Sequence, residues 1–248
     1  MSIPSLRIAR SNQILAALPR DVLERVLPDF QLKALELRQV LQPLRKPMPS
    51  AVFPLAGVAS MISTGETGGS VEVATIGSEG MVGLPLVLGG ASAASEVFVQ
   101  VPGEALFMNA VDFARHMEKE RPFLRALLLY TQALFSQVAQ CSACNGHHSA
   151  LARCARWILQ THDRVAGDEF HLTHEFLGLM LGVRRATVSE TAQTLQKRGL
   201  IRYNRGHVTL LNRLGLEKIA CECYGLITGE FDRLMRVAAV RTDRTRGR

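Results

Sequence analysis

The segment from Leu181 to Gly206, LGVRRATVSETAQTLQKRGLIRYNRG, constrains the fold more than any other part of the chain. Its first part has the apolar spacing of a helix, and Val188 and Leu195 are placed to pack against Leu177 of a preceding helical segment. Gly182 can end that preceding helix in a left-handed backbone conformation. Two short β-like runs then flank the sequence NRG. Helix, tight turn, helix and hairpin in this order predict a winged helix-turn-helix.

Positive charge is concentrated around this segment. The chain has a formal net charge of +7, yet residues 1–146 contain 12 basic and 12 acidic residues, while residues 147–248 contain 17 and 10. Within residues 180–213, seven Lys and Arg side chains face a single acidic residue, Glu190. Such a local excess is typical of a protein that binds a polyanion, although a solvated basic face is the simpler alternative.

A winged helix-turn-helix places its second helix in the DNA major groove, where arginine can donate two hydrogen bonds to guanine. We therefore expect Arg184 and Arg185 to contact base edges. Glu190 could accept a hydrogen bond from a cytosine N4, or it could pair with a neighbouring arginine. Phosphate contacts are expected mainly from five further residues on this helix and the hairpin: Thr187, Ser189, Lys197, Arg202 and Arg205.

The first half of the chain has a different pattern. From Leu32 to Met108, short β-like runs are punctuated by Gly, Pro and Ser, and GETGG at 65–69 has the composition of a hairpin turn. Strands of this kind without intervening helices indicate a sandwich or barrel. We expect short helices in residues 11–27 and a further helix over 109–119.

The longest periodic segment follows, over residues 120–146. Its apolar residues recur at spacings of three and four, which predicts the seam of a two-stranded coiled coil, with an ordinary helix buried in its own domain as the alternative. Leu128, Leu129 and Phe135 widen the stripe enough to pack on the β-rich domain, and Gly146 is expected to end the helix. The expected seam comprises Leu124, Leu127, Thr131, Leu134, Val138 and Cys141.

The predicted chain is thus an α+β protein with four parts. They are a β-rich domain with N-terminal helices (1–119), a dimerisation helix (120–146), a winged helix-turn-helix (147–225), and a terminal helix with a basic tail (226–248). The last helix is expected from Leu214 to about Val237, and the arginine-rich end RTDRTRGR is expected to be disordered.

The segment LTHEFLGLMLGVRRATVSETAQTLQKRGLI resembles the helix-turn-helix of the cyclic-AMP receptor protein/FNR (Crp/Fnr) regulators. ACNGHHSALARCARWILQTHDR and CECYG resemble a large bacterial subgroup of that family. The resemblance implies a cyclic-nucleotide-binding-like jelly roll (the β-roll), a long dimer helix and a winged helix. It also implies a homodimer that binds a two-fold-symmetric DNA site and acts on transcription through RNA polymerase. Arg185 falls where the family's receptor protein has a base-reading arginine, whereas Ala186 and Glu190 replace two other readers.

Many relatives bind a cyclic nucleotide in the β-roll. Here Met81 falls at the family's ribose-binding glutamate, and Ala93 and Ala94 fall at its phosphate-binding pair. No lysine or arginine lies between Pro47 and Ala114, so a buried phosphodiester would lack a counter-charge. We therefore expect cyclic nucleotide binding to be lost and no cofactor to be needed. A regulator still gated by a cyclic nucleotide or other ligand, and an adaptor that no longer binds DNA, are the alternatives.

The sequence contains no catalytic motif of the serine hydrolase, P-loop or metalloprotease type, and His116 is the only histidine before residue 147, so an enzyme is not expected. Five cysteines, no apolar run of membrane length and no secretion signal indicate reduced thiols in the cytoplasm.

Cys144, His148 and one of the two cysteines Cys221 and Cys223 could form a redox or metal sensor. Cys144 could share a helix face with His148, but Cys221 and Cys223, two residues apart on the last helix, should point in different directions. Small buried side chains at a helix interface are the favoured interpretation, so no metal site is expected. Cys141 on the seam raises the separate hypothesis of an intersubunit disulfide.

Overall fold

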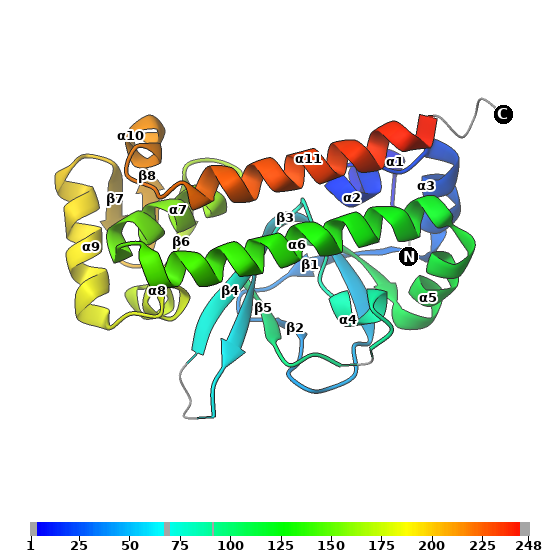
Figure 1. The fold of residues 1–248 in the computed structure, drawn as a ribbon, viewed down its shortest axis with the longest axis horizontal. Coiled ribbons are helices and arrows are strands. Elements are labelled where there is room, and N and C mark those ends of the chain that lie inside the picture. Colours follow the sequence, from blue (N-terminus) through cyan, green and yellow to red (C-terminus); the bar gives the residue numbers. More distant parts are fainter. Residues whose placement is uncertain (1–3, 67–69, 91, 244–248) are drawn as a thin grey trace.

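The computed structural model describes residues 4–66, 70–90 and 92–243. Two long helices, α6 (Arg121–His147) and α11 (Cys223–Asp243), run side by side along the length of the molecule (Figure 1). The β-roll lies against them, and the winged helix-turn-helix occupies one end of the molecule. The architecture is therefore the expected α+β arrangement of roll, long helix and winged helix.

Five antiparallel strands build the β-roll. β3 (Ser50–Thr64) pairs with both β4 (Ser70–Ile76) and β5 (Glu96–Asn109), and β5 also pairs with β1 (Gln31–Leu35) and β2 (Val40–Gln42). The pairing of β3 with β4 confirms the expected hairpin, although residues 67–69 of its turn lie outside the described residues. β5 joins two of the expected short runs, EVFVQV and EALFM, because Pro102 and Gly103 between them are accommodated within one strand.

Short helices precede the roll in the sequence. They are α1 (Leu6–Ala9), α2 (Gln13–Ala16), α3 (Arg20–Val26) and the 3₁₀ turn η1 (Leu27–Asp29). Helix α4 (Leu84–Val87) lies between strands β4 and β5 of the roll, and α5 (Ala110–Lys119) follows the roll. Asn12 caps α2 through its Oδ1 and donates from Nδ2 to the carbonyls of Pro54 and Gly80, at 2.9 and 2.8 Å. This fully buried side chain thereby fixes the helices to the roll.

The C-terminal domain contains α7 (Ala150–His162), α8 (His174–Leu181) and α9 (Arg185–Lys197), followed by β7 (Ile201–Asn204) and β8 (His207–Leu210). A third strand, β6 (Glu169–His171), completes the sheet by pairing with β8. Leu177, Val188 and Leu195 are buried in one cluster, as their spacing predicts. Gly182 ends α8 in the left-handed conformation at φ 60°, and so the predicted turn between α8 and α9 is confirmed.

Two expected helix ends are wrong. α6 continues through Gly146 to His147, because a glycine weakens a helix without being required to end it. The single last helix expected from Leu214 is divided into α10 (Arg213–Glu217) and α11, with a non-helical segment at 218–222 between them. Of the expected disordered tail, residues 241–243 belong to α11, and residues 244–248 lie outside the described residues.

Three residues of the predicted dimer seam are buried within the chain itself. Leu127, Leu134 and Cys141 are 0, 2 and 5% exposed and belong to the chain's own core, together with Phe231 and other side chains of α11. Leu128 and Phe135, expected to pack on the roll, are instead 48 and 74% exposed. The side chains were assigned to the wrong faces because one helix packs on both the roll and α11. A neighbouring stripe of α6, hereafter the free stripe, comprises the exposed residues Leu128, Phe135 and Ser142 and the half-buried residues Leu124, Thr131 and Val138. Of these, Val138 also packs against the core.

Candidate nucleic-acid interface

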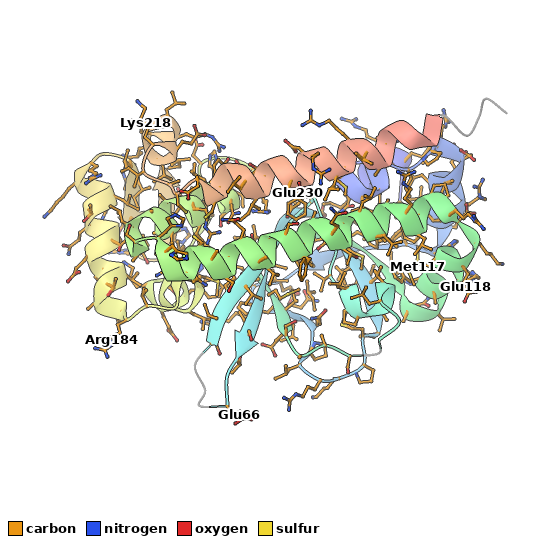
Figure 2. All side chains as sticks on the ribbon, viewed as in Figure 1. Glu66, Met117, Glu118, Arg184, Lys218 and Glu230 are labelled. Carbon is orange, nitrogen blue, oxygen red and sulfur yellow. The ribbon has the colours of Figure 1, made fainter. Side chains whose placement is uncertain are left out.

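The N-terminal end of α9 presents two arginines to solvent. Arg184 is the N-cap residue, with an extended backbone, and Arg185 is the first helical residue; both are exposed. Arg184 lies at the outer surface of the helix-turn-helix end of the molecule (Figure 2). Within the described residues, neither arginine forms an ion pair. Their guanidinium groups are therefore free to bind an external acceptor.

The remaining predicted residues of α9 differ in exposure. Lys197 and Glu190 are exposed, and neither forms a salt bridge with another described residue, so the suggested pairing of Glu190 with an arginine is not observed. Thr187 is half-buried. The Ser189 hydroxyl, also half-buried, donates to the Arg185 carbonyl at 3.2 Å and therefore already has a local partner.

The hairpin presents two further exposed arginines, Arg202 and Arg205. Arg205 and Gly206 form the turn with φ values of 46° and 81°, the signature of a type I′ hairpin. A left-handed conformation is uncommon for arginine and is often found at functional positions. It places Arg205 at the tip of the wing, on the same domain as α9.

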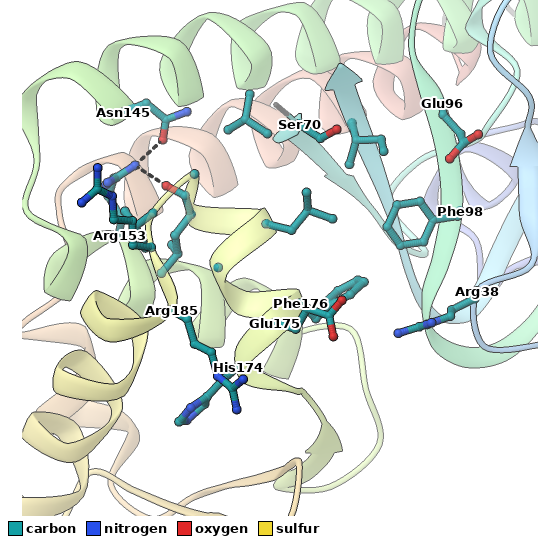
Figure 3. A pocket seen from close by; sticks show the side chains of 18 of the residues that line it. Arg38, Ser70, Glu96, Phe98, Asn145, Arg153, His174, Glu175, Phe176 and Arg185 are labelled. Atoms are coloured by element: carbon teal, nitrogen blue, oxygen red, sulfur yellow. Dashed lines mark hydrogen bonds between the residues drawn. The ribbon is translucent and has the colours of Figure 1, made fainter. Parts of the chain in front are cut away.

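Sequence patterns did not single out His174, which joins these two surfaces. Its ring stacks on Tyr203 of the wing at 4.5 Å, and its Nδ1 lies 3.3 Å from the Ser189 hydroxyl of α9. Burial and the neighbouring positive charge of Arg185 both lower the pKa of His174. Figure 3 shows its ring beside Arg185. A neutral His174 thus fixes the wing relative to α9 without adding charge repulsion.

A cleft of about 1200 Å³ separates this domain from the roll and reaches Arg184 and Arg185 (Figure 3). Phe98 of β5 and Phe176 of α8 meet edge to face across it, with 5.6 Å between ring centroids. The C-terminal domain therefore contacts the roll of the same chain through α8, the helix that precedes α9.

Two buried acidic residues of the roll form hydrogen bonds with the C-terminal domain. Glu79 accepts hydrogen bonds from the Arg164 guanidinium at 2.8 to 3.1 Å, and Arg164 also donates to the Gln160 carbonyl. Glu72 accepts a hydrogen bond from Trp157 Nε1 at 2.9 Å. Burial raises the pKa of Glu72 to about 7, against the opposing effect of hydrogen bonds and of Arg156. The interface between the roll and the C-terminal domain therefore contains a carboxyl group, that of Glu72, whose pKa depends on how the two domains pack.

Met81, the residue that the sequence resemblance aligns with a ribose-binding glutamate, lies in the interior of the chain. Met81 is fully buried, and its carbonyl accepts a hydrogen bond from the Tyr130 hydroxyl of α6 at 2.7 Å. The Tyr130 ring lies so close to Gly80 that a Cβ there would approach Cε2 to 2.5 Å. The segment around Met81 is thus packed against a buried tyrosine of α6.

The structure also brings together the four side chains that were not expected to form a site. The donor atoms of Cys144, His148, Cys221 and Cys223 all lie within 4.8 Å of one another. Cys221 precedes the first residue of α11, so the two cysteines do not follow helical geometry and both reach Cys144. Cys141 is buried within its own chain, and burial raises the pKa of its thiol to about 11, which removes the basis for an intersubunit disulfide.

Comparison with known proteins places the predicted interface in a recognised domain. Residues 152–219 match the family model of the Crp-like helix-turn-helix domain. No curated protein sequence matches the chain. Within the described residues, no helix is long and apolar enough to cross a bilayer.

Solved structures share the fold over most of the chain. The CRP-family transcriptional regulator TTHB099 of Thermus thermophilus superposes with a TM-score of 0.65 at 17% identity, covering 76% of this chain and 96% of that one. FixK2 of Bradyrhizobium japonicum superposes with a TM-score of 0.62 at 15% identity, covering 77% of this chain and 98% of that one. TTHA1359, a CRP/FNR-family transcriptional regulator of T. thermophilus, superposes with a TM-score of 0.62 at 16% identity, with the same coverage of 77% and 98%. Residues 152–219 are therefore a Crp-like helix-turn-helix domain, carried on a chain with the fold of the Crp/Fnr regulators.

Proposed function

We propose that this protein regulates transcription by binding double-stranded DNA as a homodimer on a two-fold-symmetric site. One observation carries the proposal: exposed cations without internal partners lie on the second helix and the wing of a Crp-like helix-turn-helix domain. In this geometry the start of α9 enters the major groove, so Arg184 and Arg185 read base edges. Glu190, one turn later and also exposed, accepts from a cytosine N4.

The phosphate backbone is bound on both sides of this helix. Lys197 lies at the far end of α9, and Arg202 and Arg205 on the wing meet the adjacent strand. Thr187 and Ser189 contribute hydroxyls closer to the groove. These contacts supply affinity and register, whereas the two arginines supply sequence discrimination.

The free stripe supports the homodimer. Its six residues are spaced by four and three in alternation, as in a two-stranded coiled coil, and Phe135 is 74% exposed in the single chain. An exposed aromatic side chain of this size on a long helix is typical of an interface. A dimer along α6 presents two copies of α9 to successive major grooves.

The protein acts in the cytoplasm, through RNA polymerase, and without a cyclic nucleotide. Tyr130 and Met81 occupy the matching part of the roll, and no cation lies between Pro47 and Ala114 to balance a phosphodiester. Calorimetry with cyclic AMP and cyclic GMP is expected to show no heat of binding. A saturable signal with either nucleotide contradicts this part of the proposal.

The decisive experiment is selection of bound duplexes from a random pool, followed by titration of the selected site. We expect a two-fold-symmetric site and a steep decrease of affinity with salt concentration. Arg185→Ala should weaken specific binding by about 1–3 kcal/mol while binding to random DNA changes little. Arg10→Ala, which removes an exposed arginine far from the domain, is the charge-matched control.

Two results overturn the proposal. An adaptor without DNA-binding activity gives no enriched sequence and no binding to duplex DNA at low ionic strength. An Arg185→Ala variant that discriminates its site from random DNA as well as the parent shows that the groove is read by other residues.

A further inference from the structure

The cluster of Cys144, His148, Cys221 and Cys223 lies where the end of α6 meets the start of α11 (Figure 1). Cys144 is in the last turn of α6, and His148 follows its final residue. Cys221 lies in the segment before α11, and Cys223 is the first residue of that helix. The four donors therefore come from two segments that are more than 70 residues apart in sequence.

The distances within this cluster agree with those of a tetrahedral metal site. The sulfurs of Cys144 and Cys221 are 3.5 Å apart, and Cys223 Sγ is 3.5 Å from His148 Nδ1. Bond lengths to zinc of about 2.3 Å for sulfur and 2.0 Å for nitrogen place tetrahedral ligands roughly 3.5–3.8 Å apart. All four donors lie within 4.8 Å of one another, so shifts of up to about 1 Å would enclose a zinc ion.

The surrounding groups orient the donors as in metal proteins. His148 presents Nδ1 to the cluster, while its Nε2 lies 3.1 Å from a Glu222 carboxylate oxygen. Gln140 donates a hydrogen bond from Nε2 to Cys223 Sγ at 3.1 Å. A ligating histidine commonly bonds a carboxylate through its second nitrogen, which fixes the ring and its tautomer.

Three of the four donors are buried thiols. Cys144 and Cys223 are fully buried and Cys221 is 6% exposed, so the site offers no open position to a substrate. Cys154 is also fully buried but lies outside the cluster, and burial raises the pKa of its thiol to about 12. Cys154 is therefore an inert core side chain.

We propose that Cys144, His148, Cys221 and Cys223 bind one zinc ion in a closed, structural site. The ion joins the end of the long helix to the start of the last one, on either side of the DNA-binding domain. It therefore fixes the position of that domain relative to α6. A disulfide between Cys144 and Cys221 would use two of the four donors and leave His148 and Cys223 without a role.

The test is metal analysis of the full-length protein, purified under reducing conditions without chelators. We expect about one zinc per chain, released when the thiols are blocked with a mercurial. Substitution by Co²⁺ should give the visible spectrum of a tetrahedral thiolate site. Cys144→Ser and Cys223→Ser should lose the metal, while the matched controls Cys141→Ala and Cys154→Ala should retain it.

Measurements on the unmodified protein decide the proposal even where a variant fails to fold. Less than about a tenth of an equivalent of zinc, both as purified and after titration with Zn²⁺ and desalting, overturns it. A thiol count in denaturant with chelator distinguishes the disulfide. All five cysteines should react if zinc is bound, whereas three reactive thiols without metal indicate a Cys144–Cys221 bond. Loss of metal from Cys154→Ala as large as from Cys144→Ser also contradicts the assignment.

Discussion

Glu72 provides a quantitative test of how the roll and the DNA-binding domain are joined. Its carboxylate, on β4, accepts hydrogen bonds from the Ser60 hydroxyl at 2.7 Å and from Trp157 Nε1 at 2.9 Å. The residue is 7% exposed, and burial raises its pKa from 4.5 to about 7. The charges that face it, Arg156 and Arg164, act in the opposite direction and do not cancel the effect of burial.

The raised pKa determines how stability depends on pH. Because the folded protein holds this proton more tightly than the unfolded chain, the site's contribution is fully present below pH 4.5 and is lost as the pH rises through 7. At about 1.36 kcal/mol per pKa unit, the total change is roughly 3 kcal/mol, of which about 2–3 kcal/mol falls between pH 5 and pH 8.

Glu72→Gln removes this dependence while keeping the shape of the side chain. The amide oxygen can accept from Trp157, and the amide nitrogen can donate to the Ser60 hydroxyl, which itself donates to Gln100 Oε1. We therefore expect the variant to gain about 2–3 kcal/mol of stability relative to the parent between pH 5 and pH 8.

Urea unfolding of both proteins at intervals across this pH range measures the difference directly. Glu104→Gln, which neutralises an exposed glutamate on β5, is the matched control and should give a constant offset. A difference between Glu72→Gln and the parent that does not change from pH 5 to pH 8 refutes the reasoning, because the carboxyl would then have the same pKa in both states.

Two further predictions concern association and the domain interface. Phe135→Lys should convert the proposed dimer to a monomer in sedimentation or light-scattering experiments without loss of helicity, whereas Val111→Lys, at an equally exposed apolar position on α5, should not. Arg164→Ala leaves Glu79 buried without its partner and should cost about 3–5 kcal/mol in chemical denaturation. Arg20→Ala, which removes an exposed ion pair with Glu24, is the control and should change the midpoint of unfolding little.

The helix-turn-helix could be predicted from the sequence because its determinants are local. The left-handed turn at Gly182 and the packing of Leu177 on Val188 depend on residues fewer than twenty positions apart. Charge and hairpin composition then placed Arg205 on the wing. His174 was not singled out, because its stacking on Tyr203 depends on how the wing folds back on α8, which residue spacing does not specify.

The free stripe could not be located from periodicity alone. Nearly every turn of α6 carries apolar residues on more than one face, and heptad spacing fits Leu127 and Leu134 as well as Leu128 and Phe135. Only the packing of α11 distinguishes them, since its Ile227 and Phe231 enter the same core as Leu127 and Leu134. Because α6 packs on both the roll and α11, Leu127 and Leu134 are buried. The exposed apolar residues are their neighbours in the sequence, Leu128 and Phe135.

The return of α11 along α6 explains the cysteine cluster as well. A continuous helix from Leu214 would have directed Cys221 and Cys223 to different faces, and the break at 218–222 allows both to reach Cys144. The same break sets where α11 begins, and therefore which of its side chains cover α6. A metal ion at this point would hold the end of α6 and the start of α11 together. Both the packing of α11 that leaves the free stripe exposed and the orientation of α9 would then depend on the metal site. Removing the metal should then loosen the DNA-binding domain while leaving the roll folded.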